Sequence, residues 1–139
     1  MKYMLDTCVI SELVTKKPNP KVVEWVDSLD TEDIHLSVIT IGEIIKGIEK
    51  LPESKRKQEL RDWLKQDLLS RFQGKILALD TNIIVEWGGL TARLETAGQK
   101  MPAIDSLIAA TALAHEMTLV TRNVSDFEAA GIKIANPWE

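Results

Sequence analysis

The sequence predicts an α/β fold in which a central, mainly parallel sheet of four to five strands is flanked by helices in three layers. Short apolar runs with the alternation of β-strands are each followed by a longer segment with helical spacing. Strands that alternate with helices form βαβ units, whose strands run parallel. No repeat, linker or low-complexity tract divides the 139 residues, so we expect one domain over 1–139.

The expected elements follow from this alternation. Strands are expected over 2–5, 34–38, 75–79 and 117–121, with a short edge strand over 131–134. Helices are expected over 7–14, 22–29, 40–50, 53–71, 83–94 and 102–114. The charged run Lys55-Arg56-Lys57 in the long amphipathic helix is interpreted as a solvated face.

Composition and charge limit the class of protein. Hydrophobic residues make up 45% and charged residues 27% of the chain, as in soluble globular proteins. Cys8 is the only cysteine, which excludes a disulfide framework and a cysteine-based zinc cluster. No signal-peptide pattern or membrane-length apolar run occurs, so we expect a cytoplasmic protein with no membrane partner. The net charge of −4 means that any attraction for nucleic acid must come from local basic residues or bound metal.

The segment 102–114 predicts a core helix with an acid near its start. Its buried face is expected to consist of residues at i, i+3, i+4 and i+7 spacing, namely Ile104, Leu107, Ile108 and Thr111. Asp105 falls in the first turn, where an acid complements the helix dipole. The alternative is that Asp105 binds a cation together with acids from other segments.

The remaining acids favour the second explanation. Parallel sheets bind ligands beyond the carboxyl ends of their strands. Asp6 follows the first expected strand, Glu43 lies one helical turn after the second, and Asp126 follows the fourth. With Asp105, four acids are therefore predicted to converge on one edge of the sheet. Asp80 also follows a strand, so this rule by itself admits it as a fifth.

Clustered carboxylates point to a divalent cation. Like charges within a few ångströms repel, and a hard cation such as Mg²⁺ or Mn²⁺ removes that cost while leaving positions for a substrate phosphate. Such ions activate water for phosphodiester hydrolysis. Neither His35 nor His115 has a partner at ligand spacing, which disfavours zinc, and no P-loop lysine motif is present.

Four motifs, in chain order, resemble the PIN-domain family. They are Asp6-Thr7, Thr40-x-x-Glu43 with Gly47, Pro102-x-x-Asp105-x-x-Ile108-Ala109-Ala110-Thr111-Ala112, and Thr121-Arg122-Asn123-x-x-Asp126-Phe127. The chain is most similar to the VapC/FitB-type ribonuclease toxins of bacterial toxin–antitoxin systems. The resemblance covers the whole chain.

This resemblance implies a Mg²⁺-dependent endoribonuclease in which Asp6, Glu43 and Asp105 match three family acids. The fourth position is open, because some members carry an acid where this chain has Asn123, whereas others share its Asn-x-x-Asp pattern ending at Asp126. Supporting roles in orienting carboxylates or water are expected for Thr7 and Thr121. Asp80 matches no family position and is interpreted as a helix N-cap.

The resemblance also implies partners. RNA is the expected substrate, and Arg93 and Arg122 are either phosphate contacts or members of ordinary surface pairs. A homodimer is expected. A small antitoxin protein is expected to hold it inactive by laying a helix or tail across it, which would form a larger complex. An apolar groove between the helices 40–50 and 53–71 is the expected docking surface, with Trp63 as a core residue.

Two other functions remain open from the sequence. One is a metal-dependent phosphatase-like hydrolase, although such enzymes place two acids after one strand and here Thr7-Cys8-Val9 follows Asp6. The other is a catalytically silent PIN scaffold that only binds protein.

Overall fold

A parallel five-stranded sheet organises the molecule. The computed structural model describes residues 1–139. The strand order is β3-β2-β1-β4-β5, and every neighbouring pair is parallel. The strands are β1 (Tyr3–Leu5), β2 (Ile34–Ser37), β3 (Ile76–Leu77), β4 (Thr118–Val120) and β5 (Ile134–Ala135). The predicted α/β class is confirmed, with the sheet wholly parallel.

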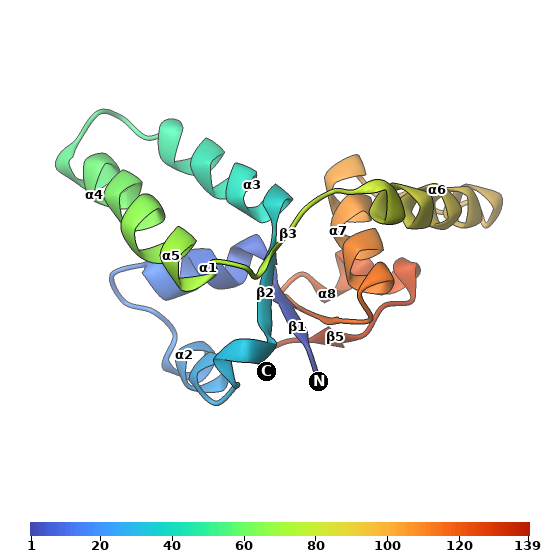
Figure 1. Cartoon of the computed structure of the whole chain (residues 1–139), viewed down its shortest axis with the longest axis horizontal. Helices are drawn as coiled ribbons and strands as arrows, with labels where there is room; N and C mark the ends of the chain where they lie inside the picture. The colour runs from blue at the N-terminus through green and yellow to red at the C-terminus, as the bar shows by residue number, and fades with distance from the viewer.

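Helices cover both faces of this sheet (Figure 1). One side carries α1 (Thr7–Val14), α2 (Pro20–Asp27), α3 (Val38–Glu49), α4 (Lys55–Trp63) and α5 (Leu69–Arg71). The other carries α6 (Thr81–Thr96), α7 (Ala103–Ala114) and α8 (Val124–Phe127). Each face has its own apolar core, one around Val9 and Leu36 and the other around Ile83 and Leu119. Short 3₁₀ turns, η1 (Thr31–Asp33) and η3 (Glu128–Ala130), complete the fold.

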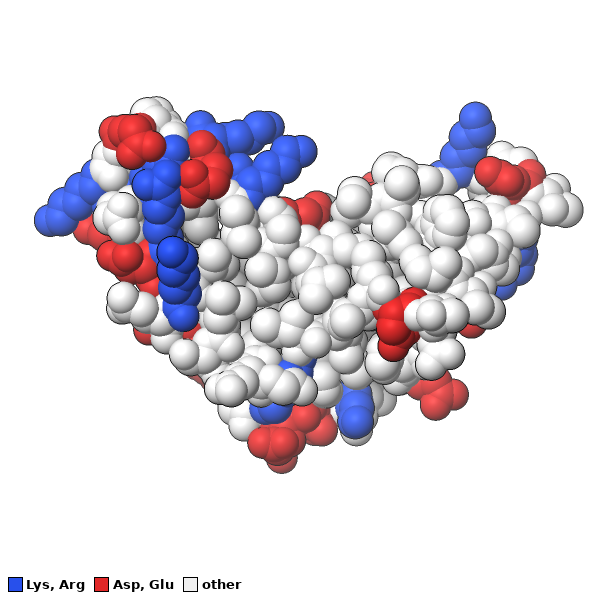
Figure 2. All heavy atoms as spheres, turned by 45° about the horizontal axis from the view of Figure 1, so that its top comes forward, with Lys and Arg blue, Asp and Glu red and all other residues white.

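The register brings the ends of the central strands to one edge. Leu5 of β1 pairs with Val120 of β4, and Met4 pairs with His35 of β2. The chain leaves β1 for α1 and β2 for α3 at this edge, which lies toward the top of Figure 1. Tilted toward the viewer in Figure 2, it is a largely uncharged face hollowed between the lobe of α3 and α4 and the lobe of α6 and α7.

Three expected elements differ from the structure. Val38, expected to end a strand, is the first residue of α3, because the Ser37 side chain accepts a hydrogen bond from the Ile39 amide and caps the helix there. The helix expected over 53–71 is interrupted by η2 (Leu64–Leu68), a π-helical turn. The edge strand expected over 131–134 begins only at Ile134 in β5, because Gly131 adopts a left-handed conformation as the C-cap of η3.

Lys57 is buried, so the solvated face predicted for residues 55–57 is wrong at this position. The residue is 5% exposed, and its Nζ donates to the carbonyl oxygens of Glu49 and Leu51 at 3.1 and 3.0 Å. The carboxylate of Glu53 lies 3.1 Å from the same nitrogen. The ammonium thus satisfies carbonyls at the C-terminal end of α3, which also carries the negative end of the helix dipole.

Replacing Lys57 tests this cap. In Lys57→Met the stem remains, but two carbonyls lose their donor, and we expect the free energy of unfolding to fall by about 2 kcal/mol. Lys55→Met, at an exposed lysine of the same helix, should change it by less than about 0.5 kcal/mol. Urea unfolding followed by tryptophan fluorescence measures both, and equal effects would contradict the capping role.

No helix of the chain is long and apolar enough to cross a lipid bilayer.

Candidate active site

Asp6 stands at the centre of the carboxyl edge, at the end of the central strand. It is 6% exposed, and its carboxylate caps α1 by accepting from the Thr7 amide at 2.9 Å. Its other oxygen accepts from Thr121 Oγ1 at 2.8 Å. Burial raises the pKa of Asp6 in spite of these two hydrogen bonds, which by themselves lower it. The carboxylate is therefore fixed in place, but its two hydrogen bonds do not offset the cost of burying its negative charge.

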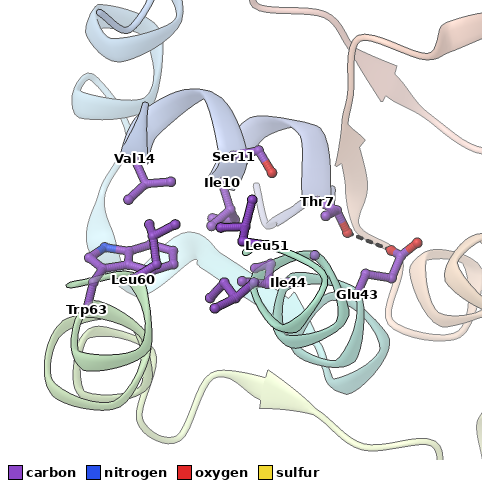
Figure 3. Close-up of a pocket in the computed structure, with 11 residues that line it drawn as sticks. Thr7, Ile10, Ser11, Val14, Glu43, Ile44, Leu51, Leu60 and Trp63 are labelled. Atoms are coloured by element: carbon purple, nitrogen blue, oxygen red, sulfur yellow. Dashed lines mark hydrogen bonds between the residues drawn. The ribbon is translucent and has the colours of Figure 1, made fainter. Parts of the chain in front are cut away.

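Glu43 approaches Asp6 from α3. Its Oε1 accepts a hydrogen bond of 2.6 Å from Thr7 Oγ1, so Thr7 joins α1 to α3 through this carboxylate (Figure 3). Thr7 thus contacts both acids, one through its amide and the other through its hydroxyl. Both hydrogen bonds restrict the orientation of the carboxylates that they reach.

Asp105 reaches the same edge from the first turn of α7. Burial is the main cause that raises the pKa of Asp105, and the carboxylates of Asp126, Asp6 and Glu43 raise it further, in that order. The side chain has no hydrogen-bond partner among the observed bonds, unlike Asp6 and Glu43. The carboxylates of Asp126, Asp6 and Glu43 therefore lie close enough to Asp105 to disfavour its ionisation.

Asp126 and Asn123 share the segment after β4. Asp126 lies in the short helix α8 and is the carboxylate with the largest effect on Asp105. The amide of Asn123 donates to Thr121 Oγ1 at 3.0 Å, which orients the hydroxyl that holds Asp6. The Asn123 side chain makes no capping hydrogen bond. Of the two residues, Asp126 acts on the carboxylate of Asp105, whereas Asn123 acts on Thr121 through its backbone.

The donor set suits a hard divalent cation. None of the four acids forms an ion pair with a lysine or arginine. As the side chains lie, no three Asp, Glu, His or Cys residues form a group that could hold a metal ion. The fit therefore rests on chemistry: oxygen donors, mutual repulsion and no positive side chain to relieve it. Small side-chain movements would be needed for several of them to reach one ion.

Cys8 is a neighbour of Asp6 that the sequence reasoning missed as part of the site. Its Sγ lies 3.9 Å from Asp6 Oδ2 and 3.5 Å from Thr121 Oγ1, and it accepts from the Arg122 amide at 3.5 Å. Burial raises the pKa of the Cys8 thiol, which favours its neutral form. Its one signal in the sequence is its position two residues after Asp6.

The two predicted arginines do not join the acids. The Arg122 guanidinium lies 5.5 Å from the centre of the Trp138 ring, a cation–π contact near the site but directed to the C-terminal segment. Arg93 lies in the last turn of α6, the far end of the helix from Asp80. Asp80 caps α6 by accepting from the Ile83 amide at 3.1 Å, which confirms its interpretation as an N-cap.

An apolar groove opens beside Thr7 and Glu43 (Figure 3). It has a volume of about 180 Å³ and lies between α1, α3 and α4, with Val14 and Trp63 at its other end. The expected groove between two helices thus has a third wall, α1. Trp63 packs against the core, as predicted, and also lines this groove.

Comparison with known proteins identifies the family. The family model of the PIN domain matches residues 3–133. The chain belongs to the PIN-domain family. It is 40% identical to the plasmid stability protein StbB of Pseudomonas syringae pv. tomato over 98% of both chains, and 40% identical to toxin FitB of Neisseria gonorrhoeae over 97% of both. It is 38% identical to a VapC ribonuclease of Sinorhizobium fredii, over 98% of this chain and 97% of that one.

Solved structures agree with this placement. The crystal structure of FitAcB from Neisseria gonorrhoeae has a TM-score of 0.93 at 39% identity and covers 99% of each chain. A toxin–antitoxin complex from Klebsiella pneumoniae has a TM-score of 0.72 at 25% identity, again over 99% of each. The resemblance to VapC/FitB-type toxins that the four motifs indicate is therefore confirmed.

The α7 helix of this PIN domain is held tightly beneath Asp105. Trp87 Nε1 of α6 donates to Ser106 Oγ at 2.9 Å, and Ser106 Oγ donates to the Ala103 carbonyl at 2.8 Å. Ser106, Ile108 and the alanines 109, 110 and 112 are buried. Ile104 is 45% exposed, so its predicted place on the buried face is wrong. The small residues of α7 let α6 and α7 approach closely.

Burial of Asp105 and repulsion from the neighbouring carboxylates predict a pH-dependent cost to stability in metal-free protein. Its folded pKa is raised, so its contribution to stability is present below the unfolded value of about 4 and is lost as pH rises through the folded pKa. In EDTA at neutral pH, Asp105→Asn should raise the free energy of unfolding by about 0.5–1 kcal/mol, since Asp105 is only half-buried.

The measurement is urea unfolding of both proteins at several pH values. The gain from Asp105→Asn should disappear at about pH 4 and below, where the carboxyl is protonated in both states. A variant that is less stable than wild type at neutral pH would show instead that the helix-dipole interaction of Asp105 outweighs the repulsion.

Proposed function

We propose that the chain, as one PIN domain over residues 1–139, is a Mg²⁺-dependent endoribonuclease toxin of the cytoplasm that a cognate antitoxin neutralises. One observation supports this proposal most directly. Four acids lie at one edge of the sheet, and none forms an ion pair with a lysine or arginine: Asp6, Glu43, Asp105 and Asp126. A relative of 38% identity is named a VapC ribonuclease, and one of 40% identity a toxin, which supports hydrolysis of RNA. Mn²⁺ is the alternative ion, because it prefers the same oxygen donors.

Different residues would hold the ion and orient the residues that hold it. Asp6 and Asp105 would hold the ion, with Glu43 and Asp126 contributing directly or through water. Bound Mg²⁺ would supply an activated water and offset the charge that develops on the phosphate. Thr121 and the Thr7 amide fix Asp6, Thr7 Oγ1 fixes Glu43, and α7 fixes the backbone at Asp105. The hydrogen bonds to Asp6 and Glu43 would limit the reorganisation of these two carboxylates during the reaction.

Two observations weigh against the other functions. A phosphatase-like hydrolase would need a second acid directly after β1, where Thr7 and Cys8 instead contact Glu43 and Thr121. A silent scaffold has no use for acids whose mutual repulsion raises the pKa of Asp105. Both alternatives have a distinct outcome in the assays below.

Protein partners are part of this proposal. A neighbour of the same fold is a toxin–antitoxin complex, and the apolar groove of α1, α3 and α4 offers a docking surface for an antitoxin helix or tail. Occupying it would bring the antitoxin against Thr7 and Glu43, at the edge of the acidic site. We also propose a homodimer, supported by exposed aliphatic residues such as Ile84 and Val85 on α6, which are 46% and 71% exposed.

RNA cleavage tests the enzymatic proposal. With Mg²⁺, purified chain should hydrolyse single-stranded RNA, and Asp6→Asn or Asp105→Asn should lower kcat/KM by more than about 100-fold. Asp80→Asn is the matched control, because it also changes an Asp at a helix N-cap after a strand, and Asn caps equally well.

Three outcomes would contradict it. Full activity in either site variant, or in excess EDTA, would remove the carboxylates or the metal from the reaction. Hydrolysis of phosphate monoesters without hydrolysis of RNA would favour the phosphatase. Absence of both activities together with no Mg²⁺ or Mn²⁺ binding by calorimetry would favour the scaffold.

The groove has its own test. Leu51 lines it and is 37% exposed, so Leu51→Asp should leave the fold intact but weaken binding of the co-expressed antitoxin by more than about tenfold, because a charge would be buried at an apolar contact. Ile45→Asp is the control, at a residue of α3 that is 41% exposed and does not line this groove. Calorimetry measures affinity, and light scattering on the same samples gives the mass of free chain and complex. Equal affinities for both variants would place the antitoxin elsewhere.

A further inference from the structure

A second groove leaves the acidic site on the α7 side of α3. It has a volume of about 530 Å³ and runs beside α3 from Glu43 to Lys50, with Ile104 of α7 on its far wall. The two grooves share Thr7, Glu43 and Gly47, and their other lining residues differ. The helix α3 therefore separates two channels that meet at the candidate active site.

Two unpaired lysines line this second groove. Lys46 and Lys50 are four residues apart, which places them on one face of the helix and about 6 Å apart along its axis. Both are exposed, and neither forms an ion pair, whereas Lys57 and Arg61 of the adjoining α4 do. Figure 2 shows Lys and Arg side chains on this lobe, with Asp and Glu side chains among them, above a face that is otherwise nearly uncharged.

Two glycines open the backbone of α3 to the groove. Gly42 and Gly47 lie within the helix, where glycine costs about 1 kcal/mol relative to alanine. A Cβ added at either position would meet no atom within 4 Å, so packing within the chain does not require them. The Gly88-Gly89 pair of α6 is equally open, and glycines by themselves indicate nothing. At positions 42 and 47 they coincide with a groove and free ammonium groups.

We propose that this groove binds the backbone of a single-stranded RNA, with Lys46 and Lys50 on successive phosphates and the strand passing Glu43 toward the acids. The inference rests on the proposed function and names the path of its substrate. A chain of net charge −4 repels RNA overall, so attraction must be local, and these lysines supply it beside the reacting edge. Ile39 and Ile104 offer apolar contact to an unpaired base. In a duplex the bases are stacked inside the helix and could not make this contact.

Binding by an inactive protein tests the path. In the full chain carrying Asp105→Asn, we would titrate a short labelled single-stranded RNA by fluorescence anisotropy at several salt concentrations. The added pair Lys46→Gln and Lys50→Gln should weaken binding about tenfold and reduce the slope of log affinity against log salt by about 1.4, the value for two lost phosphate contacts on a single strand.

Matched variants separate charge at the groove from charge in general. Lys55→Gln with Lys65→Gln removes two charges from exposed lysines of the adjoining α4 and η2 segment that line neither groove, and should leave affinity and slope unchanged. Lys46→Arg with Lys50→Arg should retain wild-type binding. Gly42→Leu should fill the groove and weaken binding, whereas Gly89→Leu, an equally open helical site on α6, should not.

The outcomes distinguish this inference from the proposed function. If the wild-type chain with Mg²⁺ does not hydrolyse RNA, the proposed function fails. If it does, but the two Gln substitutions leave RNA affinity, salt slope and kcat/KM unchanged, the path is wrong. Loss of antitoxin affinity without loss of RNA affinity would assign the lysines to an acidic protein segment and also overturn it.

Discussion

The structure depends on a carboxylate that is buried where the central strand ends. Asp6 follows β1, which lies between β2 and β4, so neighbouring strands deliver α3 and Thr121 to its two sides. Burial raises the pKa of Asp6, and Asp105 experiences the same penalty together with three like charges. The hydroxyls of Thr7 and Thr121 and the small-residue packing of α7 hold these groups in place. Repulsion at Asp105 is thus built into the fold, and a bound divalent cation would relieve it.

The helix α3 contributes residues to the candidate site and to both grooves beside it. Glu43 belongs to the site, Ile44 and Leu51 face the apolar groove, and Lys46 and Lys50 face the charged one. A single helix can serve two partners in this way because its faces repeat every 3.6 residues. The buried Lys57 ammonium caps the C-terminal end of α3 by donating hydrogen bonds to the carbonyl oxygens of Glu49 and Leu51. An occupant of either groove would therefore be positioned relative to the acids by the same rigid element.

Much of the fold and of the candidate site could be predicted from sequence. Period-two and period-3.6 patterns located the first four strands and the main helices, whereas the expected edge strand overlaps β5 only at Ile134. The rule for parallel sheets selected Asp6, Glu43, Asp105 and Asp126, together with Asp80, which instead caps α6. What could not be predicted depends on partners distant in the chain. Cys8 contacts Thr121, Trp87 holds Ser106, and Arg122 turns to Trp138. No local pattern encodes such pairs, because each is set by how two elements pack.

The sequence by itself determined the alternation of strands and helices, the parallel sheet and the family, since these depend on spacing along the chain. The tertiary structure decided the environment of each residue. It buried Lys57 within a run that reads as solvated, exposed Ile104 at a position that reads as core, and made α1 the third wall of the apolar groove. The physical reason is that periodicity reports which residues share a face, whereas burial depends on what packs against that face. Asp105 shows the difference: its place in a first turn is local, and the three carboxylates that raise its pKa come from the rest of the fold.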